Sequence, residues 1–268
     1  ACGLYPSDAY LQKKVTQLKL RFPLNEPSFR ALVGAVEASG GPRGLRTVPY
    51  SRRGLSLKQL KQIEAAQMET GWLPGLCREF EMQPNLYAMD ELFVKATTRA
   101  DPSAREKIPE EVLLIAQIPG VPSADCCFAQ LLNPDGRKVD YFVSHWWGHP
   151  FERTVQALST FAETVYKDLG KNSPDDVVFW ICLFALNQHL AAEEVGSTPE
   201  EGPFNAALAK AQHGAVMVLE NSAEPLRRIW CLYEVSRARE FNQAFRLIAD
   251  DGDVANAGAS VLEEISAR

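Results

Sequence analysis

The feature that most constrains the fold is a set of short apolar segments after residue 138 that alternate with helical stretches. Short apolar runs of this kind are typical of buried strands, whereas apolar residues three and four apart lie on one face of a helix. The predicted strands cover 139–144, 177–182, 215–219 and 244–249. The predicted helices cover 151–169, 203–212, 226–241 and 254–265. This alternation predicts an α/β fold in which neighbouring parallel strands are covered on both faces.

The first 136 residues have a different pattern, with helices separated by glycine and proline. Ser56 and Gln59 have the spacing of a capping box, which opens a helix that we expect to end at Pro74 and Gly75. Further helices are predicted at 11–22, 29–36, 109–117 and 124–132. We therefore divide the chain into a helical extension, 1–136, and an α/β domain, 137–268.

The charge is unevenly distributed between these parts. The whole chain has a net charge of -6, which argues against nucleic-acid binding through counterion release. Residues 1–60 nevertheless carry ten Lys or Arg and three Asp or Glu, a balance of +7, so the remainder carries -13. We expect an exposed basic loop, whose arginines are Arg43, Arg46, Arg52 and Arg53, to contact an acidic surface. That surface belongs either to a protein partner or to the acidic body of the chain itself.

Composition excludes several other classes of protein. With 46% hydrophobic and 23% charged residues, the sequence is that of a folded globular protein and not of a disordered or fibrous one. The longest apolar run, Val177 to Leu186, is about half the length of a membrane-spanning helix, so we expect a buried strand there and no membrane span. The six cysteines lack the spacing of zinc or redox sites, and we expect reduced thiols and an intracellular protein, with an organelle left open. Because the sequence starts at Ala1 without a signal pattern, we also expect that an N-terminal part has been removed.

Polar and aromatic side chains follow the first two predicted strands. The first strand is followed by Ser144, His145, Trp146 and Trp147, and the second by a segment that contains Asn187 and His189. Ligands of open parallel sheets bind beyond the carboxyl ends of the strands. Aromatic faces with neutral hydrogen-bonding groups suit a flat ring-bearing ligand such as a nucleotide, so we predict that these residues bind one. The alternative is that the tryptophans cap the sheet and the histidines hold loops.

We expect no metal site. His145 and His149 are four residues apart, a spacing that brings side chains together only on a helix, and Gly148 lies between them with Pro150 following.

The most specific string in the sequence lies in the third predicted helix of the sheet region. It runs from Arg228 through Trp230 and Cys231 to Glu234. Glu234 lies next to the apolar stripe of that helix, where its carboxylate can face a cleft. It can equally form a surface pair with Arg237, three residues later.

Over about residues 137–268 the sequence resembles the Toll/interleukin receptor (TIR) domain family. Three segments carry the resemblance: the strand ending in Phe142-Val143-Ser144, the strand Val216–Leu219 and the string Arg228-Ile229-Trp230-Cys231-Leu232-Tyr233-Glu234. The S-H-W-W-G string at 144–148 also resembles a set of protist proteins of unclear role. The TIR resemblance implies a flavodoxin-like sheet with five strands, of which only four are visible in the sequence, so the fifth is missing, displaced or supplied elsewhere. It implies no bound cofactor, but NAD as a substrate.

Two classes of function follow from the resemblance. In the first, the chain is an NAD glycohydrolase in which Glu234 is catalytic, and Trp230 and the residues after the strands bind the ligand. In the second, the chain is a non-catalytic TIR-like interaction subunit of a larger complex, with self-association as one form of that role. The charge split, the long extension and the absence of the acidic pair that commonly follows the second TIR strand favour the second class.

Overall fold

In the part of the chain that the structure describes, the strands form one mixed sheet flanked by helices. The computed structural model describes residues 48–195, 200, 202–220, 223–250 and 252–253. Its strands are β1 (Leu55–Ser56), β2 (Tyr141–Ser144), β3 (Val178–Ile181), β4 (Ala215–Val218), β5 (Phe245–Ala249) and β6 (Gly252–Asp253). They form a six-stranded sheet in the order β1-β3-β2-β4-β5-β6. The four central strands are mutually parallel and the two short edge strands are antiparallel to their neighbours, so the predicted α/β fold and parallel pairing are confirmed.

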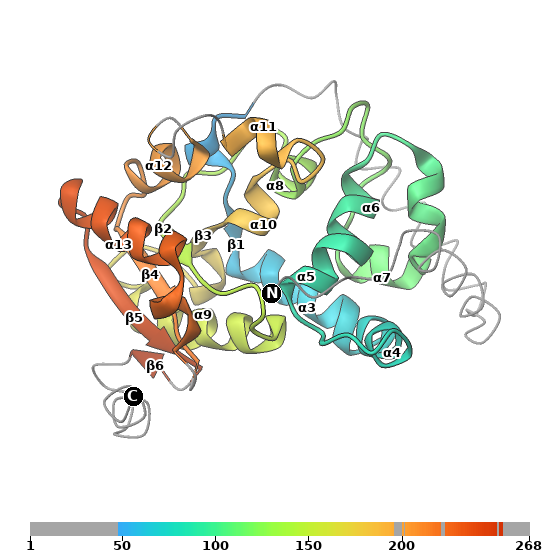
Figure 1. The fold of residues 1–268 in the computed structure, drawn as a ribbon, viewed down its shortest axis with the longest axis horizontal. Helices are drawn as coiled ribbons and strands as arrows, with labels where there is room; N and C mark the ends of the chain where they lie inside the picture. The colour runs from blue at the N-terminus through green and yellow to red at the C-terminus, as the bar shows by residue number, and fades with distance from the viewer. Residues whose placement is uncertain (1–47, 196–199, 201, 221–222, 251, 254–268) are drawn as a thin grey trace.

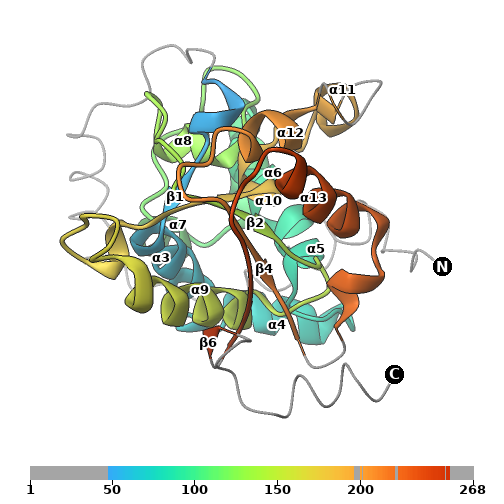
Figure 2. The ribbon, with the colours of Figure 1, turned by 90° about the vertical axis from the view of Figure 1, so that its left-hand side faces the viewer.

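Helices cover both faces of the sheet and one side of it (Figures 1 and 2). The α-helices are α3 (Leu57–Met68), α4 (Trp72–Glu79), α5 (Leu86–Met89), α6 (Lys95–Thr98), α7 (Glu110–Ile115), α8 (Phe128–Leu132), α9 (Phe151–Val165), α10 (Cys182–Ala185), α11 (Ala191–Val195), α12 (Pro203–Leu208) and α13 (Ile229–Glu240). A π-helical stretch covers Asp90–Val94, and 3₁₀ turns cover Tyr50–Arg52, Pro102–Lys107, Pro174–Asp176 and Glu224–Arg227. None of the helices in these ranges is long and apolar enough to cross a membrane.

Alternation along the strands divides the core between the two faces. Tyr141 and Val143 of β2 point into a large cluster with α3 and α9. Phe142, between them, points to the opposite face and packs with α12 and with Ala238 of α13. Successive side chains of a strand point to opposite faces, so Ser144, two residues after Phe142, is directed toward α13.

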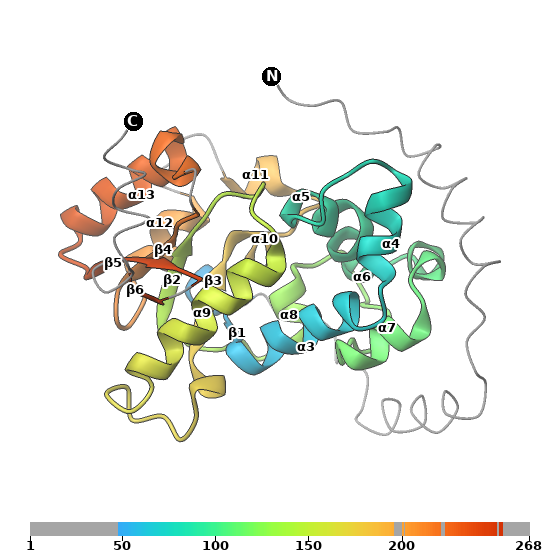
Figure 3. The same ribbon diagram turned by 90° about the horizontal axis from the view of Figure 1, so that it is seen from below.

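The sheet and the preceding helices share one hydrophobic core. Leu57, Leu60 and Ile63 of α3 belong to the same cluster as the α9 side of the sheet. The capping box that starts α3 is confirmed, because the Ser56 side chain accepts from the Gln59 backbone and the Gln59 side chain accepts from the Ser56 backbone. Figure 3 shows α3 lying along α9, with α4 to α7 grouped beyond it.

Two boundary predictions are wrong. Pro74 and Gly75 do not end the helix that begins after Ser56, since α3 ends at Met68 and both residues lie inside α4. Proline is tolerated there because the first turn of a helix has no intrahelical acceptors for its N–H groups. The apolar run from Val177 is a strand only to Ile181, and residues 182–185 form the helical turn α10. The predicted helices at 11–22, 29–36 and 254–265 lie outside the described residues.

The prediction of an exposed basic loop is wrong for Arg53. Its side chain is buried and forms an ion pair of 2.9 Å with Glu194. Arg52 is exposed and donates to the Gly136 carbonyl at 3.5 Å. Arg43 and Arg46 lie outside the described residues. The acidic contact of Arg53 is therefore made within the chain, and burial of the guanidinium follows from its partners.

Candidate functional site

The carboxyl edge of the sheet brings part of the predicted site together on its α13 face. Ser144 ends β2 on that face, and Cys182 follows β3 two residues after Trp180, which points the same way. On α13, Cys231, Glu234 and Ala238 form the buried side. Cys231 Sγ donates to the His145 carbonyl at 3.8 Å, which fixes the first turn of α13 against the end of β2.

Glu234 lies on the buried face of α13 and not beside it. It is 7% exposed, and burial raises the pKa of its carboxyl to about 7, with the Ser144 hydroxyl acting in the opposite direction. The hydroxyl is near the carboxyl without meeting hydrogen-bond geometry, since Ser144 Oγ and Glu234 Oε2 both lack a partner among the described residues. Arg227 pairs instead with Glu224, and the alternative surface pair of Glu234 with Arg237 is not formed.

His145 adds a third buried polar atom without a partner. Its Nδ1 lies 3.4 Å from the Val143 carbonyl oxygen, whereas its Nε2 has no partner in the described part of the chain. Burial lowers the pKa of His145 to about 4, and the nearby His149 and Arg228 act in the same direction. His145 is therefore neutral at pH 7, and the proton on Nδ1 that the Val143 contact favours leaves Nε2 as an acceptor. We call the residues that carry these atoms, Ser144, His145 and Glu234, the unpaired cluster; Ser144 and His145 are consecutive at the end of β2, and the Ser144 hydroxyl lies near the Glu234 carboxyl.

The two tryptophans after β2 have different surroundings. Trp147 is fixed, because its Nε1 donates to Cys182 Sγ at 3.2 Å and its ring meets Tyr87 edge to face at a centroid distance of 5.5 Å. Trp146 is half-buried and folds over Gly148, where an added Cβ would overlap its indole ring. Both rings are partly exposed, and of the two only Trp147 has its ring N–H hydrogen-bonded to a described residue.

Trp230 lies on the outer side of α13. It is 43% exposed and stacks on Phe204 at a centroid distance of 5.9 Å and an interplanar angle of 20°. Ile229 and Leu232 on the same helix are 77% and 44% exposed. These three side chains form an apolar surface at the start of α13, which we call the α13 apolar surface.

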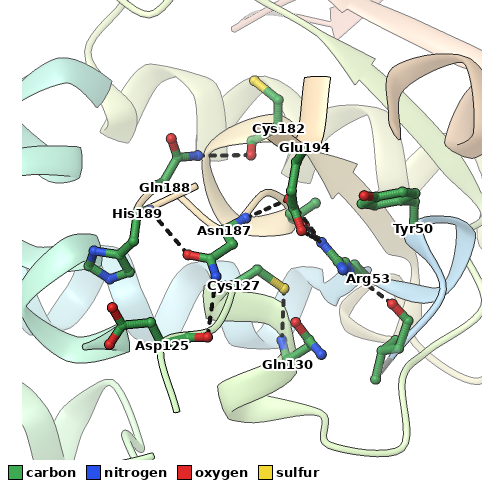
Figure 4. Close-up of polar contacts among 12 residues, drawn as sticks. Tyr50, Arg53, Asp125, Cys127, Gln130, Cys182, Asn187, Gln188, His189 and Glu194 are labelled. Atoms are coloured by element: carbon green, nitrogen blue, oxygen red, sulfur yellow. Dashed lines mark hydrogen bonds and ion pairs between the residues drawn. The ribbon is translucent and has the colours of Figure 1, made fainter. Parts of the chain in front are cut away.

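The polar side chains of the segment after β3 are engaged in hydrogen bonds within the protein (Figure 4). Asn187 Nδ2 donates to the Asp125 carbonyl at 3.2 Å, and its Oδ1 accepts from the His189 backbone at 3.1 Å. Both ring nitrogens of His189 are engaged, Nε2 with Thr98 Oγ1 and Nδ1 with Arg99, each at 3.0 Å. Burial lowers the pKa of His189, with Arg99 adding to the effect and Asp125 opposing it. These groups hold the segment to the preceding helices and are not directed to the unpaired cluster.

An ion pair between a buried guanidinium and a partly exposed carboxylate closes the same segment. Glu194 accepts from Arg53 Nη1 at 2.9 Å and from the Asn187 backbone N–H at 2.8 Å, as Figure 4 shows. Arg53 also donates to the carbonyls of Val48 and Ala185, each at 3.0 Å. Sequence reasoning missed this pair, because nothing in the pattern around either residue indicates the other, 141 positions away.

A groove of about 380 Å³ lies at the other end of the strands. It is lined mainly by polar residues of β2, β5 and the end of α9: Tyr141, Thr164, Val165, Asp168, Leu169, His213 and Arg246. None of the predicted site residues that the structure describes lines it. The residues predicted to bind a ligand after the strands lie instead at the opposite, carboxyl edge of the sheet.

Comparison of the chain with protein-family models, curated proteins and solved structures gives no match. Within the described residues, no three His, Cys, Asp or Glu side chains are grouped so that they could hold a metal ion.

Sequence reasoning also missed that Cys182 lies at this edge of the sheet, in contact with Trp147. Burial is the chief cause that raises the pKa of its thiol to about 12. The sequence could have indicated this position, because Cys182 follows Trp180 by two residues in the predicted strand and residues two apart in a strand lie on the same face.

Proposed function

We propose that the chain is an NAD glycohydrolase whose catalytic residue is Glu234. The observation that carries the proposal is the buried Glu234 carboxyl with one oxygen free of protein partners, next to the end of β2. The strand order β3-β2-β4-β5 supports a TIR-like, flavodoxin-like reading of the sheet, because it is the 2-1-3-4 order of that class.

The reaction is hydrolysis of the bond between nicotinamide and ribose. The C1′–N bond breaks and its electron pair leaves with nicotinamide, so that ribose acquires oxocarbenium character. Water then adds to C1′ and releases a proton, which gives ADP-ribose, nicotinamide and H⁺. A carboxylate beside the ribose stabilises the positive charge of the transition state.

The remaining residues of the unpaired cluster have positioning roles in this proposal. Ser144 Oγ and His145 Nε2 can hydrogen-bond to ribose hydroxyls, since neither has a partner in the described part of the protein. Trp146 supplies a ring face for the nicotinamide. Because only the ionised Glu234 stabilises the cation, and its pKa is about 7, turnover rises as the pH increases from 6 to 8.

The α13 apolar surface supports a second candidate, a non-catalytic interaction module. Exposed Ile229, Trp230 and Leu232 on one helix form the kind of surface that partner proteins cover. In that case the burial of Glu234 has no catalytic purpose.

The deciding experiment follows free nicotinamide after incubation of the protein with NAD, at low and at high protein concentration so that any self-associated form is included. Glu234→Gln should lower turnover at least ~100-fold while leaving the fold intact, since only the charge is removed. Glu240→Gln is the matched control, an exposed carboxylate on the same helix. Retained turnover in Glu234→Gln would remove Glu234 from the mechanism. No release by the wild type, even in the assembled form, would leave the interaction module.

A further inference from the structure

The polar groove at the amino ends of the strands has no part in the proposed glycohydrolase. It has a volume of about 380 Å³ and lies on the α9 face of the sheet, where the start of β2, the start of β5 and the end of α9 meet. This volume falls within the range of small-molecule sites, about 300–1,000 Å³. Because the unpaired cluster lies at the other end of β2, the groove needs a separate explanation.

A buried hydroxyl without a protein partner lines the groove. Tyr141 is 4% exposed, and its ring packs edge to face against Phe161 at a centroid distance of 4.9 Å. The His213 ring lies on another side of it, at 5.9 Å. Tyr141 Oη forms no hydrogen bond with any residue that the structure describes. Buried polar groups are normally hydrogen-bonded, so this hydroxyl indicates a partner that enters from the groove.

Two unpaired charges of opposite sign line the same groove. Arg246 is exposed and its guanidinium lies over the Phe161 ring, 5.8 Å from the ring centroid, and Asp168 is exposed just after α9. Neither forms an ion pair with the other or elsewhere in the described ranges. An unpaired charge on a surface is ordinary by itself. Together with the Tyr141 hydroxyl, however, these charges give one groove the few convergent polar groups that characterise a binding site.

The α9 side and the β5 side of the groove favour opposite charges. Asp168 follows the last turn of α9, and the carbonyl end of a helix carries a partial negative charge, so this side attracts a cation. Thr164 Oγ1 donates to the Phe161 carbonyl at 2.7 Å, which leaves its oxygen as an acceptor for a ligand. On the β5 side, the Arg246 guanidinium has only donors and attracts a carboxylate.

We infer that this groove binds a small zwitterion, with its ammonium group at Asp168 and the end of α9 and its carboxylate at Arg246 and the Tyr141 hydroxyl. Asp168 repels a simple anion and Arg246 repels a simple cation, whereas a molecule that carries both charges pairs with both side chains. Amino acids and short peptides are compounds of this class. The inference does not depend on cleavage of NAD, because the groove shares no residue with the unpaired cluster.

Binding of four zwitterions tests the inference: glycine, β-alanine, γ-aminobutyrate and glycylglycine. They differ in the distance between ammonium and carboxylate, so the tightest binder reports the separation of the two charged side chains. Calorimetry with the wild-type chain should give a Kd of about 1 mM or below for at least one of them. Acetate and methylammonium, which each carry one of the two charges, should bind at least about tenfold more weakly.

Substitutions then place the ligand in the groove. Arg246→Gln and Asp168→Asn should each weaken binding of the tightest zwitterion about tenfold or more, as expected for loss of a charge-assisted hydrogen bond. Tyr141→Phe should weaken it by about threefold to tenfold without lowering the free energy of unfolding, since it removes only an unpartnered hydroxyl. The matched controls are Arg239→Gln and Glu163→Gln, at exposed charges outside the groove, and these should stay within about twofold.

Three results would overturn the zwitterion site. The first is no binding of any of the four zwitterions, and the second is equal binding by the wild type and both charge variants. The third is binding of acetate as tight as that of the zwitterions, which would indicate a plain anion site. Calorimetry with these compounds needs no NAD, so a protein that releases no nicotinamide but binds a zwitterion through Arg246 and Asp168 would refute the glycohydrolase and leave this site standing.

Discussion

The two polar segments that follow β2 and β3 look alike in the sequence and differ in the folded protein. At the end of β2, Ser144 and His145 are buried, and each has a side-chain polar atom without a hydrogen-bond partner among the described residues. After β3, Asn187 and His189 use their polar side-chain atoms in hydrogen bonds to the backbone or to other side chains. The energetic consequence is opposite in sign, because a paired buried group stabilises the fold and an unpaired one costs free energy.

This contrast assigns a structural role to the segment after β3 and identifies the end of β2 as the candidate site. The segment after β3 ties the sheet to the helices that precede it. The end of β2 keeps hydrogen-bonding capacity that a ligand can use, and such groups are retained where function compensates for their cost. Four substitutions test whether this division is correct.

The largest effect is expected from the ion pair of the β3 segment, in which the Arg53 guanidinium is buried and the Glu194 carboxylate is partly exposed. Arg53→Ala leaves Glu194 without its cation and the carbonyls of Val48 and Ala185 without their donor, and should lower the free energy of unfolding by roughly 3–5 kcal/mol. Urea denaturation measures this change. Arg52→Ala, at the exposed neighbour, should change stability by less than about 0.5 kcal/mol. Equal effects of the two substitutions would mean that the pair does not lock the segment.

The next effect concerns the pH dependence that Glu234 confers. Its pKa is about 7 in the folded chain and 4.5 ordinarily, so the folded state binds the proton more tightly. The stability that this proton contributes is present below pH 4.5 and is lost as the pH rises through 7. Relative to Glu234→Gln, the wild type should lose up to about 3 kcal/mol over this range, at 1.36 kcal/mol per pKa unit.

Denaturation of both proteins at pH 5 and pH 8 measures that difference. The buried histidines His145 and His149, with pKa values lowered to about 4, affect both proteins and largely cancel in the comparison. A stability difference that does not change with pH would show that the Glu234 carboxyl titrates normally and is not desolvated.

A smaller loss is expected at Asn187. Asn187→Ala removes the acceptor of the His189 N–H and the donor to the Asp125 carbonyl, and should cost about 1–3 kcal/mol. Turnover of NAD should remain close to that of the wild type under conditions where both are folded. A selective loss of turnover would move Asn187 back into the ligand site that its place after β3 predicted.

The smallest effect on stability is expected at Ser144. Ser144→Ala removes a buried hydroxyl without a described hydrogen-bond partner, so at pH 5, where the Glu234 carboxyl is protonated, the free energy of unfolding should stay within about 0.5 kcal/mol of the wild type or rise slightly. If NAD is the substrate, KM should rise, because a ribose contact is lost. A clear destabilisation would indicate that the hydroxyl is satisfied in the folded protein and would weaken the distinction between the two segments.

Much of the sheet could be predicted because each of its central strands, and the helix α9, is determined by residues that are close together in the sequence. The central strands are apolar throughout, and α9 follows from the spacing of its apolar residues. Strand parity alone sends Ser144 toward the face that α13 covers. β1 was not predictable, since it is a two-residue strand whose partner, β3, lies more than a hundred residues later.

The candidate site was predictable only in part. The string in α13 drew attention to Glu234, but its position at the edge of the apolar stripe did not reveal that it is buried. Asn187 and His189 carry the same local signal as Ser144 and His145. Their different outcome depends on Thr98, Arg99 and Asp125, which the fold brings close from distant positions.

The pairing of β1 with β3 affects how the chain folds during synthesis and which fragments of it remain soluble. Leu55 lies opposite Phe179, and both are fully buried. During synthesis, residues 55–56 leave the ribosome well before β3 does, so the strand that protects this edge of the sheet is available when β3 emerges. A fragment that begins after Ser56 would expose the backbone of β3 along an apolar edge, the kind of surface that recruits other strands into aggregates. We therefore expect the α/β half to need this short segment to remain soluble on its own.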